Sequence, residues 1–281
     1  MNNYSPLRYP GGKSKLYQYL SFIIKHNAPI INYIEPYAGG AGAALALLMN
    51  QQVKKIILND SDELIYKFWY AVLNRNRLFQ ARLLSSPISV EAYKAHKELI
   101  RKFKMGKKVS DFGLGFSTLY INRCNRSGIL KSGPIGGYNQ EGTWKIDARF
   151  NKEDLVKRLE YIYDFRNHIE IYNYDALDFL RKLSDLNINP EESLVYLDPP
   201  YYVQGRELYR KYYKPKDHIA LKEYLKNDLH IRWVLSYDDI EEIHKLYSDV
   251  RKNGIVVNHF ANKAKVGKEL LIFSDNCNVP V

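Results

Sequence analysis

The chain has 281 residues, 46% of them hydrophobic, which is enough for one large domain with an insertion or for two domains. It has no run of 18 apolar residues and no signal peptide, and Cys124 and Cys277 are too few for a disulfide framework or a zinc site, so we expect a cytoplasmic protein with neither a membrane span nor a bound metal. The net charge of +11 and the isoelectric point of about 9.3 indicate a polyanionic partner.

The first seventy residues predict a short helix followed by two strand–helix units. YLSFIIKHN is typical of a short helix, NYIEPYAGG of a strand that ends in a glycine turn, and AALALLMNQ of a helix. KKIILND predicts a second strand. A further helix is predicted in SDELIYKFWYAVLN, with Ser61 as a plausible N-cap.

Residues 71–159 carry the whole excess of positive charge. They contain 18 Lys and Arg against 7 Asp and Glu, whereas the rest of the chain has 24 of each. Such a block in an otherwise balanced chain is typical of a nucleic-acid-binding insertion, and the alternative is a solvated basic surface. We therefore predict an α/β domain formed by residues 1–70 and 160–281, with a mainly helical, basic domain inserted at 71–159.

The remaining chain returns to strands and helices. IEIYNYD, SLVYLDPPYY, RWVLSYDD, IVVNHF and ELLIFS are five more strand candidates, and helices at about 176–186, 216–227 and 239–247 separate the first four. This alternation predicts a doubly wound, mostly parallel sheet that binds ligands at the carboxyl ends of its strands. Only ANKAKVGK separates the last two strands, which predicts an antiparallel hairpin. Its Lys263, Lys265 and Lys268 either contact a nucleic-acid backbone or face solvent.

The glycine turn in IEPYAGGAG lies where a backbone must pass close to a ligand. It does not match the dinucleotide fingerprint, because Leu45 stands at the third glycine position. PGGKS does not match a P-loop, because Leu7 stands where the earlier glycine is required. Asp60 follows the turn by about 20 residues, at the end of the next strand, where such folds place a carboxylate on a ribose diol. The pattern indicates an adenosine-bearing cofactor, and a purely structural turn is the alternative.

The sequence DPPY at the end of a buried strand suits methylation of the exocyclic amine of adenine. That nitrogen is a poor nucleophile because its lone pair is delocalised into the ring. Asp198 and the carbonyl of Pro199 can accept hydrogen bonds from both of its N–H groups at fixed positions. Tyr201 offers a face on which an extruded base can stack. The alternative is a strand followed by a Pro-Pro turn, with Tyr201 as a packing residue.

These motifs together resemble one family. RYPGGKSKL, EPYAGGAG, LNDSD, LYINRCNRSGI and DPPY follow the order of parts in the Dam-like, α-group adenine-specific DNA methyltransferases. The resemblance covers nearly the whole chain, whereas DPPY alone also occurs in amino-methyltransferases that act on RNA. It implies a Rossmann-like class I methyltransferase domain with a target-recognition domain between the glycine and DPPY motifs. It also implies in-line methyl transfer from S-adenosylmethionine to a flipped adenine in double-stranded DNA, by a monomer that needs no metal.

The resemblance also implies a role for individual residues. S-adenosylmethionine would be contacted by Tyr9, Lys13, Glu35, Tyr37, Gly39, Gly40, Asp60, Asp175 and Asp198. The target base would be held by Asp198, Pro199, Pro200 and Tyr201. DNA would be contacted by Asn122, Arg123, Arg126, Ser127, Gly128, Ile129 and Lys131.

Two departures from the family pattern concern the glycine loop and the target site. Ala41 stands where the loop has its second glycine, so either Gly42 serves after a shift of one residue or alanine is tolerated. The DNA-reading segment has Ser, Gly, Ile and Lys at 127, 128, 129 and 131, where enzymes that methylate GATC have Asn, Gly, Leu and Arg. Lysine does not replace the bidentate contact of arginine to guanine, so GATC is only one possible target.

Three further interpretations stay open at this stage. The segment SGPIGGYNQEGTWKIDARF is either a loop that approaches a DNA groove or an orphan base, or a plain surface hairpin. The protein could be an RNA amino-methyltransferase, which the position of the basic insertion disfavours. It could also be a catalytically silent DNA-binding protein, which has no chemical need for Lys13, Asp60 and an intact DPPY.

Overall fold

The computed structural model describes residues 4–9, 14–202, 213–261 and 263–279, and the chain forms two compact units. Of the described residues, 14–61 and 168–279 form the sheet unit, and 4–9 and 62–167 form the helical unit. The units divide at 61/62 and 167/168, whereas the sequence placed the domain boundaries at 70/71 and 159/160. Helix α3 packs against α6, and α7 against α4, so both flanking helices belong with the basic segment. The roles of the units in catalysis and recognition stay a prediction.

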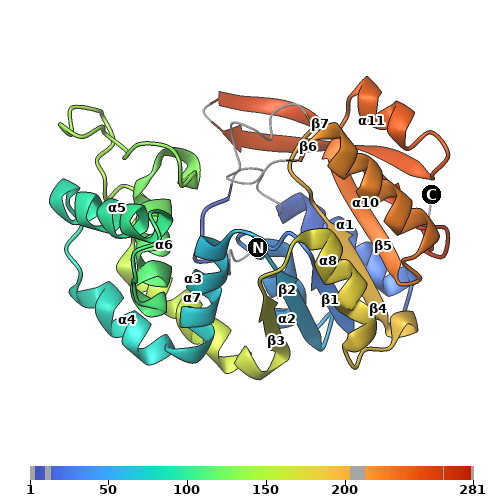
Figure 1. Ribbon diagram of the computed structural model, residues 1–281, viewed down its shortest axis with the longest axis horizontal. Coiled ribbons are helices and arrows are strands. Elements are labelled where there is room, and N and C mark those ends of the chain that lie inside the picture. Colours follow the sequence, from blue (N-terminus) through green and yellow to red (C-terminus); the bar gives the residue numbers. More distant parts are fainter. Residues whose placement is uncertain (1–3, 10–13, 203–212, 262, 280–281) are drawn as a thin grey trace. The chain divides into compact units, whose positions relative to one another are not determined.

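The sheet unit is built on a seven-stranded sheet with the order β3-β2-β1-β4-β5-β7-β6 (Figure 1). The first five strands in this order run parallel, and β7 is antiparallel to both β5 and β6. The strands are β1 (Asn32–Glu35), β2 (Lys55–Asn59), β3 (Ile169–Tyr172), β4 (Ser193–Leu197), β5 (Arg232–Asp238), β6 (Lys252–Ala261) and β7 (Lys263–Phe273). This confirms the predicted α/β class, with a doubly wound, mostly parallel sheet and a C-terminal antiparallel hairpin. β6 and β7 extend into the segment predicted as their link.

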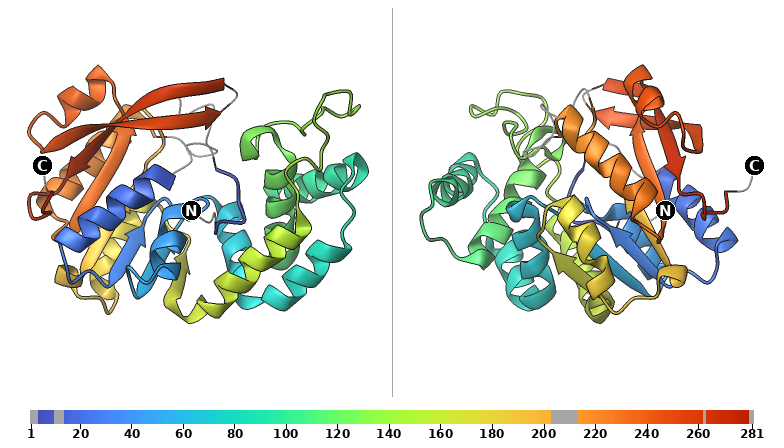
Figure 2. Two further views of the ribbon diagram at one scale, coloured as in Figure 1. Left: turned by 180° about the vertical axis from the view of Figure 1, so that it is seen from behind. Right: turned by 45° about the vertical axis from the view of Figure 1, so that its right-hand side comes forward.

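Helices cover both faces of this sheet. They are α1 (Ser14–His26), α2 (Gly42–Met49), α8 (Ala176–Arg181), α10 (Pro215–Asn227) and α11 (Glu241–Leu246), with short 3-10 turns at Lys182–Asp185 and Pro190–Glu192. The last three helices and one face of the sheet share a core that contains Val195 and Leu197, but not Leu194 or Tyr196. Because side chains alternate across a strand, β4 is buried on both faces. Helices α1 and α2 cover the opposite face (Figure 2).

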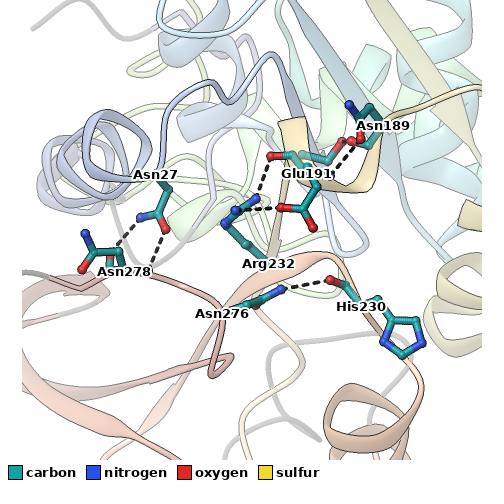
Figure 3. Close-up of polar contacts among 8 residues, drawn as sticks. Asn27, Asn189, Glu191, His230, Arg232, Asn276 and Asn278 are labelled. Atoms are coloured by element: carbon teal, nitrogen blue, oxygen red, sulfur yellow. Dashed lines mark hydrogen bonds and ion pairs between the residues drawn. The ribbon is translucent and has the colours of Figure 1, made fainter.

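Polar contacts tie together the amino ends of the strands (Figure 3). Arg232, which begins β5, donates to the carbonyl oxygen of Glu191 (2.6 Å) and to its carboxylate (2.9 Å). Asn27, just after α1, donates from Nδ2 to the carbonyl oxygen of Asn278 (2.7 Å) and accepts from its backbone N–H (2.6 Å). These contacts hold the edge of the sheet that lies away from the carboxyl ends.

The helical unit contains most of the charge excess. Its helices are α3 (Glu63–Asn74), α4 (Asn76–Ser85), α5 (Val90–Lys104), α6 (Asp111–Cys124) and α7 (Lys152–Asp164), with short 3-10 turns at Arg126–Gly128 and Arg166–His168. Within residues 4–10 and 62–167 there are 21 Lys and Arg against 11 Asp and Glu. A Cβ atom at Gly115 would lie 2.4 Å from the carbonyl oxygen of Lys67, so glycine permits the close contact between α6 and α3. The prediction of a mainly helical, basic insertion is confirmed.

One local prediction was wrong. Ser61 was expected to cap α3, but the cap is Asp62, whose Oδ1 accepts from the backbone N–H of Leu64 (3.0 Å). The backbone N–H of Asp60 still bonds to the carbonyl oxygen of Tyr172 (3.2 Å), so the extended chain leaves β2 one residue later than the sequence suggested. Helix α3 therefore begins at Glu63, directly after its cap Asp62.

Candidate functional site

The predicted strand-end carboxylates of the sheet unit lie along one edge of the sheet. Glu35 ends β1, Asp60 directly follows β2, Asp198 directly follows β4, and Asp175 follows β3 by three residues. The order β3-β2-β1-β4 runs parallel throughout, so all four strands end at the same edge. The chain direction across the sheet reverses between β1 and β4, which is where doubly wound sheets bind their ligands.

The glycine turn after β1 is joined to Asp60. The backbone N–H of Gly39 donates to Asp60 Oδ2 (2.8 Å), and Gly39 has a φ of 48°. Ala41 also lies in the left-handed region, with a φ of 47°, and precedes α2. This conformation costs an alanine roughly 1 kcal/mol. Ala41 thus takes a conformation that favours glycine, at the position where the family loop has its second glycine.

Asn59 ties the loops at this edge together, and the sequence did not single it out. Its buried side chain donates to the carbonyl oxygens of Pro36 (3.0 Å) and Tyr174 (3.2 Å), and its Oδ1 accepts from the N–H of Tyr174 (2.9 Å). Asp175 begins α8 as its N-cap and accepts from the N–H of Leu177 (3.0 Å). A polar residue at the end of a buried strand was the available signal for Asn59.

Glu35 and Tyr37, on either side of a proline, are held by other phenols. Glu35 is buried and accepts from the hydroxyl of Tyr33 (3.0 Å). Burial, followed by the charge of Glu35, raises the pKa of Tyr33 well above its usual range, so this phenol remains a donor. The hydroxyls of Tyr37 and Tyr213 are 2.6 Å apart. Burial first, and then Tyr213, raises the pKa of Tyr37 well above its usual range.

Asp198 is oriented from the neighbouring strand. Ser236 on β5 donates from Oγ to Asp198 Oδ1 (3.0 Å), and the hydroxyl of Tyr196 lies 2.7 Å from the same Oγ. Burial, with added repulsion from Asp198, raises the pKa of Tyr196 well above its usual range. Because Ser236 uses its own proton on the carboxylate, the protonated hydroxyl of Tyr196 is the donor to Ser236 Oγ. Ser236 was not predicted; a hydroxyl within the apolar strand RWVLSYDD was its signal.

The rest of the DPPY motif is largely enclosed. Pro199 and Pro200 are buried, and Tyr201 is half-buried. The hydroxyl of Tyr201 donates to Oε1 of Glu269 on β7 (3.2 Å). Asp238, which ends β5, accepts through Oδ1 from the backbone N–H of Tyr202 (3.4 Å). The motif is thus contacted from both β5 and β7.

A buried histidine under this loop makes the stability of the protein depend on pH. His218 on α10 bonds through Nδ1 to the hydroxyl of Tyr237 (2.7 Å), and its ring lies against Tyr202 and Tyr213. Among the described residues, its Nε2 has no hydrogen-bond partner. Burial lowers the pKa of His218 to about 4 from 6.5, partly offset by Asp217. Between these values the unfolded chain binds more protons, so we expect the free energy of unfolding to fall as the pH falls from 6.5 to 4.

Urea unfolding at pH 7.5 and pH 5 measures this dependence. His218→Gln should lessen the loss at pH 5, and part of the loss should remain because burial also lowers the pKa of His96 to about 4. His230→Gln, at an exposed histidine, should leave the dependence unchanged. An equal loss in wild-type protein and His218→Gln would show that His218 does not cause it.

In the helical unit, the predicted DNA-reading loop is packed on the N-terminal segment. Asn122 is fully buried, and its Oδ1 accepts from the N–H of Arg8 (2.7 Å). Its Nδ2 donates to the carbonyl oxygens of Arg8 (2.8 Å) and Gly128 (2.7 Å). Gly128 has a φ of 75° and lies directly against the Arg8 backbone. Tyr9, the next residue, is 40% exposed.

The predicted DNA contacts divide into a buried and an accessible group. Arg123 is only 8% exposed and donates to the carbonyl oxygen of Pro6 (3.5 Å), and burial lowers its pKa to about 10. Asn125, which the sequence did not single out, donates to the carbonyl oxygen of Ile129 (2.7 Å) and accepts from the hydroxyl of Tyr93 (2.7 Å). The exposed or half-buried members of the predicted set are Arg126, Ser127, Ile129 and Lys131. Asn122 and Arg123 shape the loop from within, next to Asn125.

The loop that follows presents aromatic residues to solvent. Trp144 is 71% exposed and Tyr138 is 55% exposed. Gln140 braces the loop between them, because its Nε2 donates to the carbonyl oxygen of Ile135 (2.9 Å) and its Oε1 accepts from the N–H of Ile146 (2.8 Å). The hydrogen bonds of Gln140 therefore fix the shape of the loop, and the loop presents the side chain of Trp144 to solvent.

No helix among the described residues is long and apolar enough to cross a membrane. Within the same parts of the chain, no group of three or more His, Cys, Asp or Glu is placed to hold a metal ion. Lys13 lies outside the described residues, as do the side chains of Lys263, Lys265 and Lys268.

Comparison with known proteins places the chain in a family. No curated protein sequence matches it. Among solved structures, the rRNA methyltransferase aviRa from Streptomyces viridochromogenes is similar over 92% of this chain and 85% of its own, with 14% identity and a TM-score of 0.38, which is too remote to bear on substrate. The family model for D12 class N6 adenine-specific DNA methyltransferases matches residues 9–262, a range that contains the glycine turn, the reading loop and DPPY, and so confirms the resemblance seen in the sequence. The chain belongs to the family of D12 class N6 adenine-specific DNA methyltransferases.

Proposed function

We propose that the protein transfers a methyl group from S-adenosylmethionine to the N6 amine of a flipped adenine at a specific short site in duplex DNA. Family membership supports methylation of adenine in DNA. The observation that carries the finer proposal is the DPPY motif, which follows β4 directly, beside the strand that leads into the glycine turn. A target base and an adenosine-bearing cofactor can meet at this edge of the sheet.

The residues at the strand ends fit a methyl donor that contains adenosine. Asp60 directly follows β2, next to the glycine turn, where a carboxylate can accept from a ribose diol. The residues proposed to hold the donor are Tyr9, Lys13, Glu35, Tyr37, Gly39, Gly40, Asp60, Asp175 and Asp198. When bound, S-adenosylmethionine supplies a methyl group activated by the adjacent sulfonium.

The chemistry proposed for this chain is the positioning of adenine N6. The Asp198 carboxylate and the Pro199 carbonyl accept hydrogen bonds from the two N6–H groups, which turns the nitrogen lone pair toward the methyl group. Ser236 supports this role because it directs a proton to Asp198 Oδ1 and so limits rotation of the carboxylate. Tyr201 stacks on the base. Transfer would be a single in-line displacement without a covalent enzyme intermediate. The methyl group would pass to N6, the donor would leave as S-adenosylhomocysteine, and N6 would lose one proton.

DNA binding is proposed for the helical unit. Arg126 and Lys131 are exposed and cationic, which suits contacts to phosphate, while Ser127 and Ile129 border the same loop. Asn122, Arg123 and Gly128 support the loop shape on which those contacts depend. A monomer that acts on DNA in the cytoplasm completes the proposal.

Trp144 provides a direct test of the DNA interface. Trp69 and Trp233 are buried, so Trp144 is the exposed member of the three tryptophans. We expect duplex DNA to quench its fluorescence, because a base that stacks on an indole also shields it. Trp144→Ala should weaken DNA binding about tenfold, since one stacked base contributes about 1–3 kcal/mol. Fluorescence titration and salt-matched binding assays measure both effects.

Two variants serve as controls for this prediction. Trp144→Phe should retain much of the affinity but lose the fluorescence change. Tyr161→Ala removes an exposed aromatic from α7 and should change neither. Unchanged affinity in Trp144→Ala, together with unquenched wild-type fluorescence, would place this loop outside the interface.

The proposed function is tested by transfer of labelled methyl from S-adenosylmethionine to unmethylated duplex DNA, with RNA assayed in parallel and the modified positions mapped. N6-methyladenine at one short sequence would establish the reaction and identify the site. Label in RNA alone would replace the proposal with an RNA amino-methyltransferase. DNA binding without label would indicate a catalytically silent relative.

A further inference from the structure

Glu269 is a buried acid at the start of the predicted strand ELLIFS, outside the glycine, DPPY and DNA-reading motifs. It lies on β7, opposite Asp238 on the neighbouring strand β5, and only 6% of it is exposed. Glutamates are rarely buried unless their carboxylates are paired or hydrogen-bonded, because removal of the charge from water is costly. The contacts of Glu269 therefore indicate why it is retained at this edge of the sheet.

The carboxylate lies beside the target-base motif. Its Oε1 accepts from the hydroxyl of Tyr201 at 3.2 Å. Glu269 also acts on the phenol of Tyr196, because burial, then the charge of Asp198, then that of Glu269 raises the pKa of Tyr196. Two carboxylates thus act on the same small region, one from the end of β4 and one from β7.

A tyrosine that stacks on a base needs a fixed ring plane. Tyr201 follows two buried prolines, which restrict the backbone before it but not the rotation of its own side chain. A hydrogen bond at the far end of the ring limits rotation about the Cα–Cβ bond, because the hydroxyl must stay within reach of the carboxylate. A phenol O–H also prefers to lie in the plane of its ring, so the direction of the acceptor favours one ring plane. β7 is held against β5 by antiparallel pairing that includes the Asp238–Glu269 pair, so the acceptor is carried by the sheet.

We infer that Glu269 is a positioning residue for the reaction, which holds the ring of Tyr201 in the plane on which the target adenine stacks. This inference rests on the proposed function and adds to it a residue outside the DPPY motif. In this role Glu269 acts through Tyr201, whose hydroxyl donates to it. Its contribution therefore depends on the tyrosine hydroxyl.

A double-mutant cycle tests this dependence. The proteins are wild type, Tyr201→Phe, Glu269→Ala and the double variant, and the readout is the single-turnover rate constant of methyl transfer to duplex DNA with both substrates saturating. We expect Glu269→Ala to lower the rate constant about tenfold in the wild-type background. In the Tyr201→Phe background it should have little further effect, within about twofold, because the hydroxyl is already absent.

Further variants separate positioning from folding. Glu269→Gln keeps an oxygen acceptor and should stay within about threefold of wild type. Glu241→Ala, at an exposed glutamate on α11 that pairs with Lys245, should leave the rate unchanged. Urea unfolding of each protein reports on stability: a merely structural role would lower the free energy of unfolding equally in both backgrounds and leave the rate constants uncoupled. If Glu269→Ala does not fold, Glu269→Leu, which fills a similar volume without an acceptor, takes its place in the cycle.

The outcomes of the cycle are distinct. Non-additive rate effects, with rescue by glutamine, support the positioning role. Additive effects, or a wild-type rate in Glu269→Ala, overturn it while methyl transfer by the wild-type protein still upholds the proposed function. Absence of transfer to DNA by wild-type protein overturns both.

Discussion

Asp198→Ala is expected to lower the rate of methyl transfer by about 10³-fold or more, with duplex DNA binding nearly unchanged. The variant removes the acceptor that fixes one N6 proton, and groups of this kind each contribute about 10²–10⁴-fold to a rate. Ser236, which now donates to Asp198 Oδ1, would also lose its acceptor at this site. Single-turnover incorporation of labelled methyl gives the rate, and a DNA titration in the presence of the donor gives the affinity.

Two variants are matched to this change. Asp198→Asn keeps the shape and one oxygen acceptor but loses the charge, so we expect a rate between those of wild type and Asp198→Ala. Asp178→Ala removes an exposed acid on α8 that pairs with Arg181, and should leave the rate unchanged. Turnover by Asp198→Ala comparable to that of wild type would contradict the proposed role of this carboxylate.

Gly128→Ala is expected to destabilise the helical unit by about 3 kcal/mol and to impair DNA binding. A Cβ atom there would lie 2.3 Å from the Arg8 carbonyl oxygen, and the φ of 75° is unfavourable for alanine. Overpacking costs about 1–3 kcal/mol, and a left-handed residue other than glycine adds about 1–2 kcal/mol. The Arg8 backbone must then move, and it is the group that Asn122 holds. Urea unfolding and DNA affinity are the measurements.

Gly133→Ala is the control from the same region. No atom lies within 4 Å of its added Cβ, and its backbone is outside the left-handed region, so we expect stability and DNA affinity close to wild type. Equal behaviour of the two variants would show that the reading loop is not held against the N-terminal segment.

The sequence by itself determined the class of fold and the place of the candidate site within it. Apolar runs of strand length alternate with helices, and this local pattern persists because each strand of a parallel sheet is buried on both faces. The position of DPPY after β4 follows from the same pattern, because the apolar residues of β4 alone are enough to predict a strand that ends just before Asp198. The concentration of basic residues in the insertion is likewise a property of composition, and the helical unit contains them.

Only the tertiary structure decided which residues support these motifs. Ser236 and Glu269 are far from DPPY in sequence, and the order β4-β5-β7 brings them to it. Asn122 and Arg123 were predicted from a motif to contact DNA, yet their side chains lie inside the helical unit. The physical reason is that burial and hydrogen-bond partners depend on long-range packing, whereas propensity and periodicity describe each segment alone. The side chains that hold a site in place are therefore found by their contacts.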